Sequence, residues 1–451
     1  MVTLTGAGLI VHGAVLLAAF WKTGAIDGFA FNSLDCGEYH AIARNIVEHG
    51  AFSQSQTPPL EPDTWRTPGY PLFLALTMLL VGEYAAALVL VQQVLSILNV
   101  LLVFRAAREW MSDSRAGFAA LLFLIEPYHL YYSLWLLSTT WLLTLILLTW
   151  VVWSRAVRSG KLRWFGLLGG LCGFLVLTWP GTILVPVALL GGTIVSRAIR
   201  WQERPVGGGA RGTWCGAVFL IFCATVIGSW MIRNQQVASR FALSHQSGIV
   251  LAYFKATEVQ LWRQNRTADR YLETSLSEER RDQPHPIWES IDEALRDRLH
   301  DLPVERLREL TWPNLAQGNK SSVDSFRISA ELATIAVKQF LEAPLSTIEC
   351  CLARCGSILA FPLDLALWPP NGVEVHRLRS AAVGGAYLLI VVGVAVRLAR
   401  RRFGFEAVYF PLACTLALLL ATTPQTDPRF RVPMIPLMLF VALLPVPSAR
   451  L

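Results

Sequence analysis

The sequence has few charged residues: only 16% are Asp, Glu, Lys or Arg, whereas 54% are hydrophobic and the mean hydropathy is +0.45. This composition excludes an ordinary soluble globular protein, in which about a quarter of the residues are charged. Long apolar runs recur along the chain. Because only helices and closed barrels satisfy their backbone in lipid, these runs predict an all-α polytopic membrane protein.

Several short motifs are also absent. There is no GxxxxGK[ST] and no GxGxxG after a strand, which disfavours a free sugar nucleotide as substrate. The first apolar run, 4–21, has no basic region before it and no small-residue cleavage site, so we expect a retained span. The eight cysteines form no CxxC pair. For the cluster Cys350, Cys351 and Cys355, helix packing is favoured over a metal site or a disulfide.

The apolar runs and basic loops predict ten spans with both termini in the cytoplasm. The net charge of +7 comes largely from Arg and Lys in short loops between runs, the pattern of cytoplasmic loops, so nucleic acid is not expected as a partner. Two further stretches, 67–82 and 346–362, must then be interfacial or re-entrant helices on the outer face. The predicted spans are 4–21, 84–104, 116–133, 134–153, 164–179, 181–197, 213–231, 381–398, 406–422 and 431–447.

Three parts follow from this topology. Residues 1–231 form an N-terminal membrane module with a large first outer loop, 22–83. Residues 232–380 are richer in charge and predict a small outer-face helical cap with re-entrant helices, whose charge runs are solvated faces. Residues 381–451 hold the C-terminal membrane helices.

The first outer loop concentrates the polar chemistry. Asp35, Glu38, Tyr39 and Ile42 follow i, i+3, i+4, i+7 spacing and should share one helix face. Asp35 with Glu38 also has the spacing of a capping box, so a purely structural role stays open. After the helix stop at Gly50 comes a proline-rich turn region that carries Arg66 and then the Pro68-Gly69-Tyr70-Pro71 corner.

These features resemble a known family. An acid with Tyr four residues later, an interfacial PGYPLFLAL and a basic turn are similar to bacterial protein-mannosyltransferase-like proteins (glycosyltransferase family 39 and the lipid A aminoarabinose transferases) of the GT-C superfamily. Trp230-Met231-Ile232-Arg233-Asn234 resembles the family's WxxRN, and the segment AVKQFLEAPLSTIECCLARCGSILAF resembles its re-entry helix. Asp427-Pro428-Arg429-Phe430-Arg431-Val432-Pro433-Met434-Ile435-Pro436 resembles its closing (E/D)xRYRxPxxP.

The resemblance implies an inverting membrane glycosyltransferase. It would move a sugar from a polyprenyl-phosphate donor to a hydroxyl of a lipid, glycan or protein acceptor, on the periplasmic face of the bacterial inner membrane. The reaction requires no cofactor, and a divalent cation is compatible with it. The match makes Asp35 the general base, with Glu38 as the alternative or as a group that tunes it. Donor-phosphate binding would fall to Arg233, Arg429 and Arg431, while Tyr39, Arg66 and Tyr70 would line the cavity.

Structural roles compete with each of these assignments. Arg429 and Arg431 could snorkel to lipid headgroups, and Arg233 could anchor the end of a span. His129 and His245 lack ligand-like spacing, which favours structural roles. The chain also departs from the family pattern at Leu137-Ser138-Thr139-Thr140, which has no acid, and at Thr178-Trp179-Pro180, where an arginine is missing.

Two functions from other classes remain open at this stage. A transporter or flippase of lipid-linked saccharides would need ionisable residues near the bilayer midplane, but the span interiors carry almost no charge. A non-catalytic assembly subunit would leave Asp35 without a task.

Overall fold

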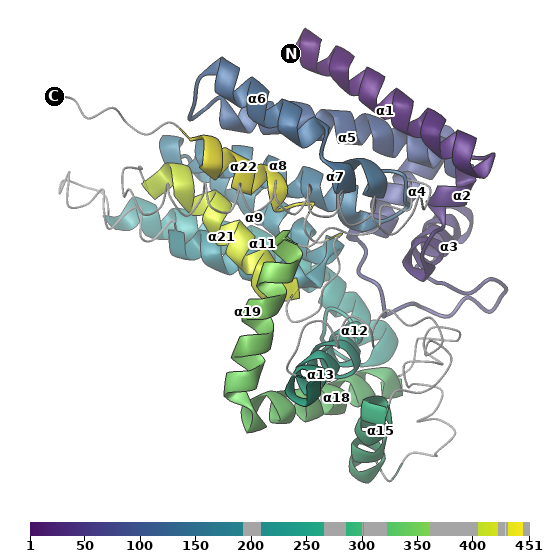
Figure 1. Ribbon diagram of the computed structural model, residues 1–451. Helices are drawn as coiled ribbons and strands as arrows, with labels where there is room; N and C mark the ends of the chain where they lie inside the picture. Colours follow the sequence, from purple (N-terminus) through teal and green to yellow (C-terminus); the bar gives the residue numbers. More distant parts are fainter. Residues whose placement is uncertain are drawn as a thin grey trace.

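The computed structural model describes residues 1–192, 209–265, 286–299, 301, 323–360, 405–422, 429 and 432–444. Within these ranges every regular element is a helix, which confirms the predicted all-α fold. Most of the apolar helices run side by side in one bundle (Figure 1). They are α1 (Val2–Thr23), α4 (Gly69–Val81), α5 (Ala85–Ala107), α6 (Asp113–Leu124), α8 (Ser138–Ser159), α9 (Leu162–Thr178), α11 (Gly209–Ala238), α21 (Phe405–Thr422) and α22 (Ile435–Leu443).

Among the described residues, four helices are long and apolar enough to cross a membrane: α1, α5, α8 and the part of α11 from Thr213 to Ala238. Shorter apolar helices cover Gly69–Val81, Leu162–Thr178, Pro180–Gly192 and Tyr409–Thr422. The chain is therefore a polytopic membrane protein, as predicted. The predicted span at 381–398 lies outside the described residues.

The predicted span at 116–133 is interrupted in the structure. Helix α6 ends at Leu124, and a separate short helix, α7 (Pro127–Tyr132), follows. The break has a local cause, since Pro127 occupies the first turn of α7 and the Glu126 carboxylate accepts a hydrogen bond from the His129 amide at 2.5 Å. Glu126 is thus an N-cap, a role that its place inside an apolar run did not reveal.

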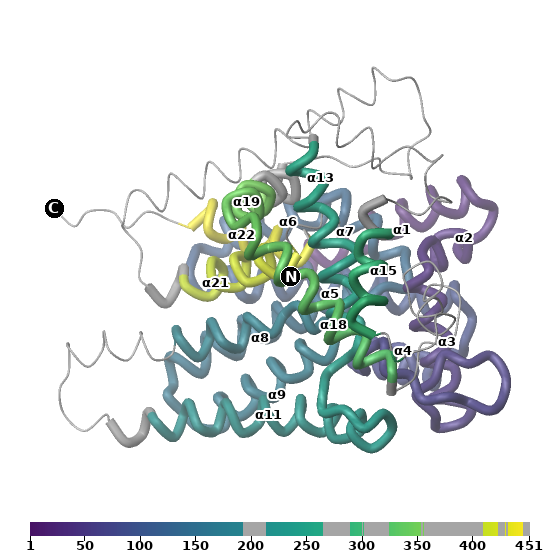
Figure 2. Tube along the Cα trace, turned by 90° about the horizontal axis from the view of Figure 1, so that it is seen from below, coloured from purple at the N-terminus to yellow at the C-terminus, as the bar shows by residue number. Residues whose placement is uncertain are grey.

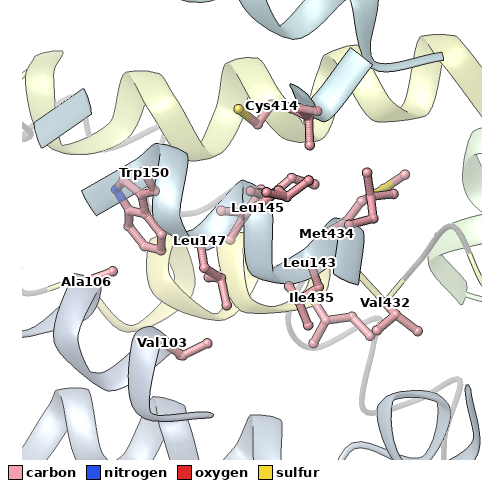
Figure 3. Packing of buried hydrophobic residues seen from close by; sticks show 14 of the residues in the cluster. Val103, Ala106, Leu143, Leu145, Leu147, Trp150, Cys414, Val432, Met434 and Ile435 are labelled. Atoms are coloured by element: carbon pink, nitrogen blue, oxygen red, sulfur yellow. The ribbon is translucent and has the colours of Figure 1, made fainter. Parts of the chain in front are cut away.

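Helix α8 is the centre of the bundle. It is buried on nearly all sides, as expected for a largely apolar helix surrounded by other helices. Trp150 stacks on Phe410 of α21 with ring centroids 5.9 Å apart and meets Phe440 of α22 edge-on at 4.7 Å. Figure 3 shows Leu143, Leu145, Leu147 and Trp150 facing side chains from α5, α21 and the segment that leads into α22.

Two glycines let α9 and α11 pack closely. A Cβ at Gly169 would lie 2.2 Å from the Phe219 carbonyl oxygen, and one at Gly173 would lie 2.7 Å from Cβ of Val226. The two glycines are four residues apart and so share a face of α9. Small residues at this spacing let membrane helices approach backbone to backbone.

A second group of helices packs beside the bundle (Figures 1 and 2). It comprises α12 (Gln246–Ile249), the π-helical turn η2 (Val250–Ala256), α13 (Thr257–Asn265), α15 (Pro286–Arg298) and α18 (Val323–Glu342). Its own hydrophobic cluster includes Ile249, Tyr253, Ile291, Leu295 and Leu332. We call these helices the cap. They lie within the predicted segment 232–380, and the three-part domain division itself stays a prediction.

The charged residues of the cap form surface ion pairs. Arg298 donates to Glu331 at 2.5 Å, and Arg327 reaches Asp301 at 2.6 Å, with exposed or half-exposed side chains. Helix α19 (Pro344–Ala360) follows α18 and runs across the direction of the bundle helices (Figure 1). It corresponds to the stretch 346–362, for which an interfacial or re-entrant helix was predicted.

Candidate functional site

Helix α3 (Leu34–His49) carries the predicted acidic face. Ser33 is the N-cap residue, with extended backbone angles (φ −148°, ψ 157°), and Gly50 ends the helix in the left-handed conformation. Asp35 therefore lies inside the first turn, and its carboxylate does not cap the helix. The capping-box interpretation of Asp35 and Glu38 is wrong, because both side chains turn to an arginine from the following loop.

That arginine is Arg66. Its Nη2 donates to Asp35 Oδ1 at 2.5 Å and its Nε donates to Glu38 Oε2 at 2.6 Å. The guanidinium carbon lies 4.9 Å from the Tyr39 ring centroid, and Nη1 is 3.5 Å from the Tyr39 hydroxyl. Burial lowers the pKa of Arg66, but the two carboxylates raise it further, so the pKa stands well above its ordinary value. Arg66 is thus a fixed cation that joins three residues of α3.

A second arginine reaches Asp35 from the far end of the chain. Arg429 Nη1 donates to Asp35 Oδ2 at 2.7 Å, across 394 residues of sequence. Burial raises the pKa of Asp35, but Arg66 and Arg429 outweigh it and hold that pKa well below its usual value. The Asp35 side chain keeps a quarter of its surface exposed. A carboxylate in this state is ionised at neutral pH and remains partly accessible.

Aromatic side chains support the cluster from behind. Tyr39 meets Tyr70 edge-on, with ring centroids 4.9 Å apart, and the Tyr70 hydroxyl donates to Gln92 Oε1 at 2.9 Å. Tyr39 also has a side-chain hydrogen bond with Ser138, at the start of α8. Tyr70 is fully buried and Tyr39 is nearly so. Both rings pack against the charged cluster, and their role as cavity-lining residues stays a prediction.

Arg233 belongs to α11, and its side chain contacts the proline-rich loop instead of Asp35. Its Nη1 donates to the backbone carbonyl of Asp63 at 2.5 Å and to Asn234 Oδ1 at 2.9 Å. The guanidinium also lies over two aromatic rings, 5.4 Å from that of Phe52 and 4.8 Å from that of Trp230. Arg233 thus holds the backbone of the loop, whereas Arg66 and Arg429 meet at Asp35. Arg431 lies outside the described residues.

Asp63 is a buried acid that the sequence reasoning missed. Its Oδ1 accepts hydrogen bonds from the amides of Trp65 and Arg66, at 2.6 and 3.2 Å, and its Oδ2 accepts one from Gln54 at 2.6 Å. Burial raises its pKa, while these three donors lower it. An aspartate that accepts from the backbone amide two residues further on forms an Asx turn, as Asp63 does with Trp65. An aspartate after a proline in a loop, as in Pro62-Asp63-Thr64-Trp65-Arg66, is a sequence signal for such a turn.

The remaining polar candidates have structural surroundings. His129 and Ser96 form a buried hydrogen bond, and so do His245 and Thr64. All eight cysteines are free thiols. Within the described ranges no group of three or more His, Cys, Asp or Glu side chains is arranged to hold a metal ion.

Comparison with known proteins finds a match to one family model over part of the chain. Residues 65–230 match the family model described as dolichyl-phosphate-mannose-protein mannosyltransferase. This match confirms the resemblance predicted from the sequence to the GT-C glycosyltransferases of this group. The sequence has no match among the curated proteins.

Solved structures of GT-C glycosyltransferases are similar to this chain at low identity. ArnT from Cupriavidus metallidurans bound to undecaprenyl phosphate has a TM-score of 0.38 at 16% identity, over 97% of this chain and 77% of that one. The archaeal oligosaccharyltransferase AglB from Archaeoglobus fulgidus, in complex with an inhibitory peptide and a dolichol-phosphate, gives 0.41 at 14%, over 97% and 50%. The arabinosyltransferase EmbB from Mycobacterium smegmatis gives 0.37 at 16%, over 96% and 40%.

Proposed function

We propose that this chain, which matches the mannosyltransferase family over residues 65–230, transfers a sugar from a polyprenyl-phosphate donor to an acceptor hydroxyl. One observation carries the proposal: the paired carboxylate Asp35, bridged by Arg66 and Arg429 and a quarter exposed. It combines a proton acceptor with fixed cations, the two kinds of group that this reaction needs.

Asp35 is the general base in this proposal. It accepts the proton of the acceptor hydroxyl as the hydroxyl oxygen attacks the anomeric carbon of the sugar. The bond between that carbon and the phosphate oxygen breaks, and the lipid phosphate leaves with the electron pair. Attack from the face opposite the leaving group inverts the anomeric carbon. The two arginines keep Asp35 ionised and therefore able to accept a proton, but by lowering its pKa they also make it a weaker base.

Arg429 is the first candidate for the donor phosphate. Its guanidinium lies beside Asp35 and a quarter of its surface is exposed, and an arginine can bind a phosphate through two parallel N–H groups. Arg431 stays a candidate by its position in the sequence. Arg233 already donates to backbone carbonyls of the proline-rich loop. It therefore ranks behind Arg429 as a candidate to bind the donor phosphate.

Glu38 supports Arg66 in this proposal. Its carboxylate accepts from Arg66, and its side chain is 13% exposed against 25% for Asp35. The more exposed acid is the better placed of the two to meet an acceptor from outside. Glu38 therefore holds the arginine in place, with the role of base as its alternative.

The cluster belongs on the outer face of the membrane. Helix α8 begins beside Tyr39, at Ser138, and ends with Arg155 and Arg158, which belong to a loop expected in the cytoplasm. The opposite end of the helix then faces outward. This orientation supports a donor and an acceptor reached from the periplasm of a bacterial inner membrane.

The test is transfer by the purified protein in lipid nanodiscs, with radiolabelled polyprenyl-phosphate sugars and membrane extract as the acceptor source. We expect Asp35→Asn to lower kcat by about 10²- to 10⁴-fold, the usual contribution of a general base. Undiminished transfer by a folded Asp35→Asn protein would sink the assignment. Movement of the labelled lipid across a vesicle bilayer without any transfer would favour a flippase instead.

A further inference from the structure

Residues 63–66, here called the strap, connect the charged cluster to the cap. Trp65 is 2% exposed and belongs to the hydrophobic cluster of the cap, together with Ile249, Tyr253 and Leu332. Its neighbour in sequence, Arg66, instead contacts Asp35 and Glu38 on α3. The side chain of Trp65 thus packs in the cap, whereas that of Arg66, the next residue, pairs with the acids of α3.

The backbone of the strap is also held by the segment that leads into the cap. The Ser244 hydroxyl donates to the Trp65 carbonyl at 2.6 Å, and the His245 amide donates to the Thr64 carbonyl at 3.3 Å. The Thr64 hydroxyl and His245 Nδ1 are 3.0 Å apart, and the His245 ring meets the Trp65 ring at 5.3 Å. Side chain and backbone of the strap are therefore both held by residues of the cap or of the segment that leads into it.

The position of Arg66 depends on this attachment. Its guanidinium donates to Asp35 and Glu38, so the place of the strap decides how well the guanidinium reaches these two carboxylates. The Arg66 backbone amide also donates to Asp63 Oδ1, so the position of Arg66 is tied to the rest of the strap.

We propose that Trp65 is a positioning residue: packed into the cap, it holds the Arg66 guanidinium against Asp35 and so lets the cap set the geometry of the charged cluster. The inference rests on the proposed function for its kinetic consequence. The structural consequence, displacement of Arg66 from Asp35, does not depend on which reaction the protein performs.

The test compares Trp65→Ala with a cap variant that leaves the strap intact, Leu295→Ala, whose side chain lies in the same cluster but on α15. We expect Trp65→Ala to lower kcat/KM by about 10- to 100-fold, the scale of an ångström-sized misplacement. The double variant Trp65→Ala/Arg66→Ala should be no worse than Arg66→Ala alone, because two residues that act through one interaction are not additive. Additive losses, or an equal loss in Leu295→Ala, would overturn the proposal.

A second readout needs no activity. The carboxyl band of Asp35, identified in the infrared spectrum as the band lost in Asp35→Asn, should titrate at higher pH in Trp65→Ala and keep its midpoint in Leu295→Ala. If Trp65→Ala does not fold, Ser244→Ala removes one strap contact and should shift the midpoint in the same direction by less. An unchanged midpoint in folded strap variants overturns the positioning role. A shifted midpoint without any transfer activity overturns the proposed function alone.

Discussion

Arg429→Gln removes one of the two cations that keep Asp35 ionised. Arg429 Nη1 lies 2.7 Å from Asp35 Oδ2, while Arg66 holds the other oxygen. A neighbouring arginine lowers the pKa of an aspartate by about 1–3 units. Because Asp35 is partly exposed and Arg66 remains, we expect the lower end of that range. The pKa of Asp35 should rise by about one unit, or about 1.4 kcal/mol.

The same change alters the dependence of stability on pH. The pKa of Asp35 is lower in the folded protein than in the unfolded chain, so its ion pairs stabilise the fold above the unfolded pKa. That stability is lost as pH falls through the folded pKa. The unfolded chains of wild type and Arg429→Gln titrate alike, so the stability gap between the two proteins should be constant around neutral pH. It should shrink only as pH falls through the folded pKa values of Asp35, which lie well below that of a free aspartate.

Infrared titration of the Asp35 carboxyl band measures the shift directly, and thermal melting in detergent follows the stability gap. Arg44→Gln is the matched control. Arg44 lies on α3, as Asp35 does, but its ion pair with Glu48, at 2.9 Å, is exposed. It should leave the Asp35 titration unchanged. An unshifted midpoint in Arg429→Gln, or the same shift in Arg44→Gln, would refute the reasoning.

Three further predictions concern other parts of the molecule. Glu38→Gln should reduce transfer less than Asp35→Asn does in the same kinetic assay, and an equal or greater loss would make Glu38 the base. Gly169→Ala should lower the melting temperature by several degrees, because its Cβ would lie 2.2 Å from a carbonyl oxygen of α11, whereas Gly170→Ala, with no atom within 4 Å, should not. Burial lowers the pKa of Lys255 to about 8, so unfolding takes up a proton between about pH 8 and 10. Thermal stability should rise with pH across that window, and Lys255→Met should lack this rise.

The sequence predicted the acidic face because helical periodicity is local. Asp35, Glu38 and Tyr39 do share a face of α3, and all three contact Arg66. The capping-box alternative failed at the helix start. The spacing of Asp35 and Glu38 fits a capping box as well as a shared binding face. The structure decides for the shared face, because Ser33 is the N-cap residue and Arg66, 31 residues after Asp35, pairs with the carboxylate.

Long-range contacts were less accessible. Arg429 entered the prediction through the family resemblance, and nothing in the local sequence links it to Asp35. Trp65 and Asp63 were missed because their roles depend on the cap and on the fold of the loop. The helix pair α9 and α11 was predicted as two spans, but the closeness of their contact at Gly169 is a tertiary property. Patterns within one helix are readable from sequence, and contacts between elements mostly are not.

Charge balance links the geometry of the cluster to the proposed reaction. Two carboxylates, Asp35 and Glu38, face two guanidiniums, Arg66 and Arg429, so the cluster is neutral as a unit. A polyprenyl-phosphate donor adds negative charge to it. Arg66 is tied to α3 by two carboxylates, whereas the Asp35 contact of Arg429 is a single bond from the far end of the chain. Sharing Arg429 with the phosphate would weaken that bond and raise the pKa of Asp35. Under the proposed function, the base then becomes stronger when its donor is in place, because one arginine serves both groups.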